Sequence, residues 1–357
     1  MDQNTRRDKR STKKHKHLGL KITLAVVALL VIGIGAVFGM MWNQTQSTFN
    51  KIYDSDGTKH DTTIKQKKPF SILLLGADTG ADGRISRGNS DTIMVVTINP
   101  NTHKTVVTSV ARDTLAEMVG TKSLNVQKLN AAYNIGESKM AKASVKKLLN
   151  VPINYYATIN MGGLEKIVDA VDGVTITSSM NVTFDGITIT KGKHHLNGKQ
   201  ALAYSRMRYQ DPRGDYGRQL RQQQVMMAVL KKLATPSGIT KYSALMKTLE
   251  PYLRTDITLD DAMKLATDYR SNLDNISSKQ LTEKSAMING SSYQVPSTET
   301  LQSVSDELRT QLGLSKETLS NQNTRLNKLN AAFFNDESST TYNTDGAVTQ
   351  YYTNTTY

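Results

Sequence analysis

Arginine is concentrated in one short stretch of this sequence, residues 204–224, which reads YSRMRYQDPRGDYGRQLRQQQ. The guanidinium of arginine is a planar, permanently charged fork that binds phosphate or carboxylate groups through paired hydrogen bonds. A solvated surface is the more common explanation of a charged run, but the spacing here favours a binding site for an anion. The charged residues of the stretch are Arg206, Arg208, Asp211, Arg213, Asp215, Arg218 and Arg221.

The first part of this stretch is predicted to be extended. Residues 205–209 lack a helix cap and lead into Pro212, which disfavours helix in the residue before it. Successive side chains of an extended segment alternate, so Arg206 and Arg208 are expected to point the same way. The two arginines would then act as a pair.

The second part is predicted to be a helix that begins near Tyr216 and is capped by residue 214 or 215. Its apolar stripe contains Val225 and Val229, and helical spacing places Arg218 and Gln222 on the same stripe, one or two turns earlier. A charge at the end of a buried stripe needs a partner. That partner is either an internal aspartate or a bound anion, whereas Arg213 in the turn and Arg221 off the stripe are not expected to bind it.

Carboxylates follow an apolar segment in residues 73–92, LLLGADTGADGRISRGNSDT. Asp78 ends the predicted strand, a glycine-rich loop carrying Arg84 and Arg87 follows, and Asp91 opens the next strand. Active sites of open α/β sheets lie beyond the carboxyl ends of strands. Two aspartates beside a bound phosphate suit Mg²⁺, which prefers few carboxylates and substrate oxygens. Capping of turns is an equally simple role for both aspartates.

A third charged strand end is SVARDT, in which Arg112 and Asp113 follow an apolar strand. The sequence has no cysteine, which excludes disulfides, thiolate metal sites and cysteine nucleophiles. It also lacks the GxSxG and GxxxxGK[ST] motifs, and the adjacent His194 and His195 face opposite ways. Arginines with Asp-bound magnesium are the groups used in phosphoryl transfer, and a net charge of +14 favours an anionic partner.

The remaining pattern predicts an α/β fold, with a mixed central sheet and helices on both faces. Strands are expected at FSILLLGAD, at the pair DTIMVVTINP and KTVVTSVARD, at INYYATIN and at GVTITSS, with strand-like sequence at 280–294. Helices are expected at 126–134, 138–149, 161–171, 198–204, 216–234, 239–249, 259–270 and 298–312. The helix at 259–270 has a capping box formed by Thr258 and Asp261.

The chain is predicted to be anchored in the cell membrane by a single N-terminal transmembrane helix. Residues 22–42 contain no charge and are long enough to span a bilayer of about 30 Å. Residues 1–21 carry eight Lys or Arg and only two Asp, which places this basic tail in the cytoplasm and the rest outside, a single-pass type II topology. The rest divides into a linker at 43–68, a catalytic domain at 69–314 and a disordered Ser/Thr/Asn/Tyr-rich tail at 315–357.

These motifs, in this order, resemble those of the LytR–CpsA–Psr (LCP) family. The resemblance covers about 70–312 and is carried by LLLGAD, NSDTIMVVTINP, SVARDT, LNAAYN, YYATINMGGLEKIVDAVDGV and HHLNGKQALAYSRMRYQDPRGDYGRQ. It implies an LCP-type ectodomain, a phosphotransferase that moves a glycopolymer (teichoic acid, capsule or another wall polysaccharide) from a polyprenyl-pyrophosphate carrier to peptidoglycan through a phosphodiester bond. The partners implied are the membrane, the polyprenyl-pyrophosphate-linked glycopolymer and peptidoglycan, with no nucleic acid.

The resemblance also implies roles for individual residues. Asp78 and Asp91 would hold Mg²⁺ or Mn²⁺ at the pyrophosphate, and Asp113 would orient Arg112. Many members carry arginine where this sequence has Asn89, and Arg87 or Arg84 is expected to substitute for it. The residues expected to bind the pyrophosphate are Arg112, Arg206, Arg208, Arg218, Gln222 and Arg87.

Two other functions fit the same residues. A polyprenyl-pyrophosphate pyrophosphatase would use water in place of the sugar hydroxyl. A non-catalytic protein of the cell envelope, with a binding or regulatory role, would use the arginines only to hold an anionic polymer. A DNA-reading role is not expected, because a cytoplasmic tail of 21 residues is too short for a recognition domain.

Overall fold

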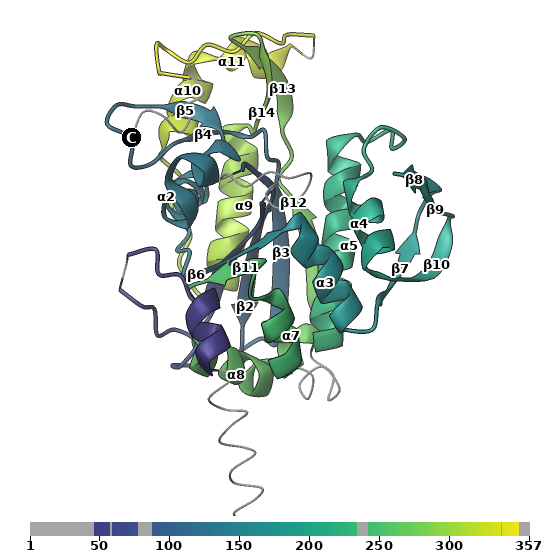
Figure 1. The fold of residues 1–357 in the computed structure, drawn as a ribbon. Helices are drawn as coiled ribbons and strands as arrows, with labels where there is room; N and C mark the ends of the chain where they lie inside the picture. Colours follow the sequence, from purple (N-terminus) through teal and green to yellow (C-terminus); the bar gives the residue numbers. More distant parts are fainter. Residues whose placement is uncertain (1–45, 58, 78–87, 234–241, 337, 350–357) are drawn as a thin grey trace, which may run out of the picture. The chain divides into compact units, whose positions relative to one another are not determined.

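The structure is a computed structural model that describes residues 46–57, 59–77, 88–233, 242–336 and 338–349 (Figure 1). Residues 1–47 and 48–357 form two separate units, and the second contains almost all of the described residues. The predicted cytoplasmic tail at 1–21 and the predicted membrane span at 22–42 lie outside the described ranges. Within those ranges, no helix is both long enough and apolar enough to cross a membrane.

A six-stranded mixed sheet forms the centre of the fold, in the order β11-β6-β1-β2-β3-β12. The strand β1 pairs antiparallel with β2 and parallel with β6, while β3 pairs antiparallel with β2 and parallel with β12. The predicted mixed sheet is therefore confirmed. Its strands are β1 (Phe70–Ala77), β2 (Ser90–Asn99), β3 (Lys104–Val110), β6 (Tyr155–Asn160), β11 (Leu253–Thr255) and β12 (Ile276–Gln280).

Alternation along β1 sends apolar side chains to both faces of the sheet. Leu73 and Leu75 pack with residues of α2 (Ala131–Leu149) and α9 (Thr298–Gln311). Phe70 and Ile72 pack on the opposite face with Tyr269, which follows α8 (Leu259–Asp268). Helical segments thus pack on each face, and the predicted capping box of Thr258 and Asp261 is present at the start of α8.

A second apolar cluster lies beside the sheet and supports the arginine-rich stretch. It is built from Val225 and Val229 of α5 together with residues of the neighbouring helices and short strands. Burial of this stripe fixes the helix α5, and with it the arginine side chain on its first turn. The elements are α3 (Met161–Ala170), β7 (Val174–Ser178), β8 (Val182–Phe184), β9 (Ile187–Ile189), β10 (Gly192–Leu196), α4 (Gly198–Arg206) and α5 (Asp215–Leu233).

Two short strand pairs lie at the end of the sheet where the site is found. The strand β4 (Leu115–Glu117) pairs with β5 (Val126–Lys128), and β13 (Lys284–Ile288) pairs with β14 (Ser291–Val295). The predicted helix at 126–134 is therefore wrong for its first half. A three-residue strand has too little periodicity to be recognised, and its pairing with β4 decides its conformation.

The predicted disorder of the tail at 315–357 is wrong for its described part. Two helices, α10 (Gln322–Leu329) and α11 (Ala331–Asn335), pack against β13 and β14, and Phe333 and Tyr342 are buried (Figure 1). The rings of these two aromatic residues lie edge to face with centroids 5.3 Å apart. The polar composition of this segment did not indicate the packing. A few aromatic residues are enough to anchor the segment when a neighbouring hairpin covers them. Residues 350–357 lie outside the described ranges.

The predicted linker at 43–68 is also packed on the domain over its described residues. Phe49 and Ile52 lie in a helical segment and are buried with residues of α7 (Tyr242–Leu249). Ile64 is buried as well, and Tyr155 donates a hydrogen bond to the carbonyl of Asp61 at 3.0 Å. The few apolar residues of this segment are too widely spaced to show periodicity, so no pattern in the sequence indicated this packing.

Candidate active site

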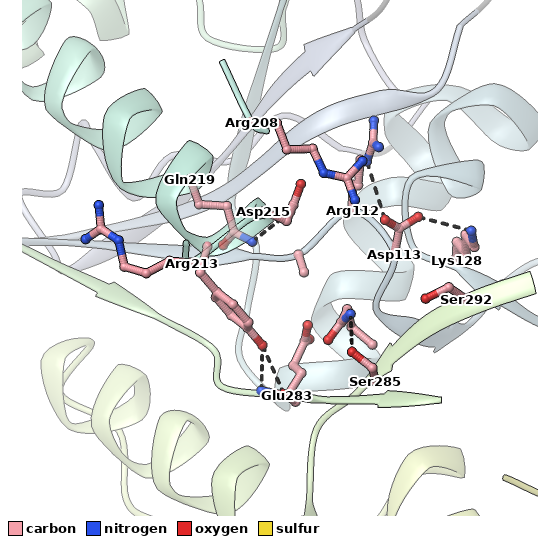
Figure 2. Close-up of a pocket in the computed structure, with 13 residues that line it drawn as sticks. Arg112, Asp113, Lys128, Arg208, Arg213, Asp215, Gln219, Glu283, Ser285 and Ser292 are labelled. Carbon is pink, nitrogen blue, oxygen red and sulfur yellow. Dashed lines mark hydrogen bonds and ion pairs between the residues drawn. The ribbon is translucent and has the colours of Figure 1, made fainter. Parts of the chain in front are cut away.

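A cavity of about 430 Å³ opens where β3 ends, between the start of α5 and the hairpin β13–β14 (Figure 2). Four separate parts of the chain meet there: the strand end at 111–113, Lys128 at the end of β5, the turn and helix at 208–219, and the segment 283–294. Its lining combines four cationic with three acidic side chains. The lining residues are Ala111, Arg112, Asp113, Lys128, Arg208, Arg213, Asp215, Tyr216, Gln219, Glu283, Ser285, Ser292 and Gln294.

Arg112 is held between two carboxylates at the end of β3. Its Nη1 donates to Oδ1 of Asp91 at 2.9 Å, and its Nε lies 3.5 Å from Oδ2 of Asp113. Burial alone would lower the pKa of Arg112, but Asp91 and Asp113 outweigh it and raise this pKa. Lys128 pairs with the other oxygen of Asp113 at 3.2 Å. The two aspartates therefore fix the orientation of a guanidinium that stays charged.

Arg218 enters the site from the first turn of α5. Its Nη2 lies 2.7 Å from Oδ1 of Asp215, while Gln219 donates to Oδ2 of the same carboxylate at 3.1 Å. Burial lowers the pKa of Arg218, which is only 8 % exposed. Because the pKa of a free guanidinium lies far above neutral pH, Arg218 nevertheless remains a cation in a poorly hydrated place.

The two arginines before the turn do not share one environment. Arg208 lines the cavity, whereas the guanidinium of Arg206 lies 5.2 Å from the ring centre of Phe184. The predicted extended segment at 205–209 is wrong at its start, because α4 continues to Arg206 and only Met207 leaves the helix. A capping box between Asn197 and Gln200 starts this helix at Gly198, where the sequence predicted it, and the helix runs two residues further than predicted.

The turn between α4 and α5 is organised by Asp211, whose side chain is buried. Arg213 donates to it through Nε and Nη2, both at 3.0 Å, and Arg221 donates to it through Nη1. Arg221 also donates to the carbonyls of Tyr204 and Met207. This residue therefore has a structural role, in line with its position off the apolar stripe.

Several buried polar atoms around the site have no hydrogen-bond partner among the described residues. Nε of Arg218, Oε1 of Gln219, Oε1 of Gln222 and Oε2 of Glu283 all belong to this group. Buried polar groups are nearly always paired in folded proteins, so each exception needs an explanation. A bound polar ligand would supply the missing partners of this cluster.

Two of the predicted site residues, Asp78 and Arg87, lie outside the described ranges, as does Arg84. The other predicted metal ligand, Asp91, is described, and its Oδ1 is occupied by Arg112. No group of three or more His, Cys, Asp or Glu side chains suited to a metal ion occurs in the described ranges. Mg²⁺ needs only one or two carboxylates besides phosphate oxygens, so the environment of Asp91 is compatible with it.

Sequence reasoning missed most of the hairpin side of the cavity. Glu283, Ser285, Ser292 and Gln294 lie about 70 residues beyond the arginine-rich stretch and match none of the motifs considered. The one local sign is an acidic residue, Glu283, beside an apolar strand. Burial raises the pKa of Glu283 well above its usual value of 4.5, and nearby Asp215 and Asp113 raise it further.

An arginine-lined cavity at the strand ends of a mixed sheet defines an α/β protein with a site suited to an anionic ligand. The chain belongs to the LytR_cpsA_psr family, whose model matches residues 38–310. The polyisoprenyl-teichoic acid–peptidoglycan teichoic acid transferase TagU of Enterococcus faecalis is 40% identical over 291 residues, which cover 81% of this chain and 94% of that protein. The family resemblance of the sequence is thus confirmed.

Solved structures agree with this assignment. The protein gbs0355 of Streptococcus agalactiae superposes with a TM-score of 0.68 at 37% identity, covering 74% of this chain and 94% of that one. A structure of TagT bound to LIIa-WTA superposes with a TM-score of 0.60 at 28% identity, covering 72% of this chain and 95% of that one.

Proposed function

We propose that this protein is a transferase that moves a glycopolymer from a polyprenyl-pyrophosphate carrier to peptidoglycan, forming a phosphodiester bond. The observation that carries the proposal is the convergence of Arg112 and Arg208 on one cavity, with Arg218 buried beside it. The similarity to TagU, which is named as a teichoic acid–peptidoglycan transferase, supports the same reaction. Such a cluster suits a substrate with two adjacent phosphate groups.

The arginines act on the charge of the pyrophosphate. Arg112 is fixed by Asp91 and Asp113, and Arg218 is fixed by Asp215, so neither side chain must reorganise when the substrate binds. Preorganised donors in a poorly hydrated site stabilise developing negative charge more strongly than water does. The forked geometry of guanidinium also matches the paired oxygens of a phosphate group.

In the transfer step, the oxygen of an acceptor sugar hydroxyl attacks the phosphorus that carries the glycopolymer. The bond from this phosphorus to the bridging oxygen breaks, and polyprenyl phosphate leaves with the electron pair. The hydroxyl proton passes to a base, and Asp113 and Asp215 are the carboxylates of the cavity within the described chain that are suited to accept it. Positioning and charge neutralisation supply most of the rate enhancement in such reactions.

Magnesium, or manganese, belongs to this proposal as a cofactor. Asp91 would hold the ion together with Asp78, and Asp91 lies beside the guanidinium of Arg112 where a phosphate would bind. When bound, the ion would neutralise charge on the pyrophosphate. The proposal also places the protein in the cell membrane, with residues 22–42 as the anchor and the catalytic domain outside. The apolar run and the basic residues before it support this topology.

The test uses the purified full-length protein in detergent with a labelled lipid-linked donor, a peptidoglycan oligomer and Mg²⁺. Transfer gives a labelled oligomer and unlabelled polyprenyl phosphate, as the proposal expects. Release of the labelled glycopolymer phosphate without linkage would identify a pyrophosphatase. Donor that stays bound and intact would identify a binding protein, and either of these two results would overturn the proposal.

A further inference from the structure

The two long walls of the cavity differ in charge (Figure 2). One wall carries Arg112 and Arg208, which are assigned above to the phosphates, together with Asp215, the partner of Arg218. The opposite wall is formed by Glu283 and by polar, uncharged side chains of the hairpin β13–β14, namely Ser285, Ser292 and Gln294. Lys128 lies at the edge of this wall, over the ring of Tyr293, and its charge is paired with Asp113. A second phosphate would gain little from this wall, whereas an uncharged polar ligand would find hydrogen-bonding groups there.

Glu283 is the one acidic residue of this wall, and its contacts indicate that it is uncharged. The hydroxyl oxygen of Thr114 lies 2.6 Å from the carbonyl oxygen of Ala111 and 2.5 Å from Oε1 of Glu283. A hydroxyl has a single hydrogen, so when Thr114 donates it to the carbonyl, the hydrogen on the other contact must come from Glu283. Burial and the facing carboxylates of Asp215 and Asp113 raise the pKa of Glu283, which favours this neutral form.

The second oxygen of this carboxyl group is left without a partner. Oε2 of Glu283 is buried and has no hydrogen-bond partner among the described residues. In a neutral carboxyl group that donates through Oε1, Oε2 is a hydrogen-bond acceptor. A hydroxyl or an amide N–H of a ligand in the cavity would satisfy it.

The uncharged wall is held in register with the charged one. The backbone N–H of Gln294 donates to the carbonyl of Asp113 at 2.9 Å, next to Arg112. The backbone of Glu283 is also fixed. Its N–H donates to the hydroxyl of Tyr216 at 2.9 Å, and that hydroxyl donates to the carbonyl of Glu283 at 3.1 Å. A ligand on this wall would therefore lie at a fixed distance from a phosphate on the arginines.

The same face of the hairpin extends beyond the cavity. Ser292 is opposite Met287 in the strand register, and Ser285 is opposite Gln294, so these four side chains share one face. Met287 is 48 % exposed, so its side chain adds a small apolar surface to this face. Polar groups beside a small apolar surface suit a sugar, which presents hydroxyls at its edge and C–H groups on its face.

We propose that this wall, Glu283 with Ser285, Ser292 and Gln294, is the subsite for the acceptor sugar of peptidoglycan. Glu283 acts as a neutral acceptor of a hydrogen bond from a hydroxyl or amide group of that sugar and positions it beside the phosphate. The inference rests on the proposed function, because the acceptor is defined by the transfer reaction.

The test measures the rate of transfer by the full-length protein. The concentration of the peptidoglycan oligomer is varied while the lipid-linked donor is kept saturating. Ser292→Leu and Glu283→Leu should each raise the KM for the oligomer roughly tenfold, the effect of losing about one hydrogen bond, and leave donor binding unchanged. Glu283→Gln should retain transfer, since the amide can donate to Thr114 and keep an oxygen free for the ligand. Ser303→Leu, at an exposed serine of α9 outside the cavity, is the matched control and should behave as the wild type.

Weakened donor binding with an unchanged KM for the oligomer would overturn the subsite. Loss of kcat at saturating oligomer in Glu283→Gln would overturn the neutral role, because it would show that an ionised carboxylate is required. If the wild type makes no linked product, the proposed function fails, but direct binding of the oligomer still tests the subsite. If the oligomer binds to the wild type and to Ser303→Leu but not to Ser292→Leu, the subsite is supported. Equal binding of the oligomer to all three proteins would refute the subsite.

Discussion

Arg221 donates to the carboxylate of Asp211 inside the turn that joins α4 to α5, and neither residue lines the cavity. The side chains are 4 % and 0 % exposed, so this is a buried ion pair within the arginine-rich stretch. Arg221 also binds two backbone carbonyls of the same turn. The pair thereby fixes the path of the chain on which Arg208 and Asp215 are carried.

Breaking this pair from one side should destabilise the protein. Asp211→Asn leaves Arg221 without its counter-charge and should lower the free energy of unfolding by about 3 kcal/mol, as for other buried pairs. Urea unfolding of the full-length protein in detergent measures the loss. Hydrogen bonds from Arg213 and Arg221 hold the pKa of Asp211 below its usual value of 3.8, so the stabilisation is complete at neutral pH and is lost only in acid below that value. Equal stability of wild type and variant at pH 7 would contradict this role.

Gly217 should not tolerate a side chain, because a Cβ there would lie 2.0 Å from Oδ2 of Asp211. Gly217→Ala must displace either the carboxylate or the start of α5, and should destabilise the fold by about 1–3 kcal/mol, as overpacking does. Gly214→Ala is a useful comparison, since that site has open space but a φ of +56°. A neutral effect of Gly217→Ala on the denaturation midpoint would show that the turn can rearrange.

Loss of a cavity arginine should affect transfer and not folding. Arg208→Ala removes a donor that lines the cavity and should lower kcat by roughly 10²-fold, the usual effect of one preorganised donor on a developing anion. Arg206→Ala is predicted by the family resemblance to act in the same way, although Arg206 lies against Phe184 in the structure. Arg325→Ala removes an exposed arginine paired with Asp345 and serves as the control. Transfer at the wild-type rate in Arg208→Ala would refute the phosphate-binding role.

Transfer should depend on a divalent cation that Asp91 helps to hold. Activity should be lost in EDTA, return with Mg²⁺ or Mn²⁺, and be lost in Asp91→Ala. Since Arg112 also pairs with Asp91, loss of activity in this variant does not by itself show that the metal is lost. Mn²⁺ binding followed by electron paramagnetic resonance separates loss of the metal from misplacement of Arg112. Full activity of the wild type in EDTA would exclude the cofactor.

Glu283 should make the stability of the protein fall as the pH rises. Burial raises the pKa of this carboxyl well above its usual value of 4.5. At a pH between 4.5 and the raised pKa of the folded state, the unfolded chain has released a proton that the folded chain retains. Stability therefore decreases with pH across this window, and the decrease ends at the pKa of the folded state. Glu283→Gln should remove this dependence and be the more stable protein at pH 7 to 8. Parallel pH profiles of wild type and variant would contradict the neutral state of Glu283.

The sequence predicted the sheet well because each long strand carries its own signal. The continuous apolar runs of β1, β2 and β3 and the turn between the last two appear where the sequence placed them. Short elements lacked such a signal, and β5 was mistaken for helix because three residues show no recognisable periodicity and only their pairing with β4 makes them a strand. The docked segments at 48–64 and 322–342 were missed for the same reason, since each buries only a few apolar residues.

Within the site, the sequence by itself determined which chemistry is present: arginines in a spaced cluster, aspartates at strand ends, and no cysteine. It also placed Arg218 on the buried stripe of α5, because helical periodicity is a local property. Only the tertiary structure decided how these groups are paired. In that structure Arg112 pairs with Asp91, Arg221 pairs with Asp211, and Glu283 and the hairpin β13–β14 line the cavity. Contacts between residues far apart in the chain depend on how the sheet and helices pack, and no local pattern of residues encodes them.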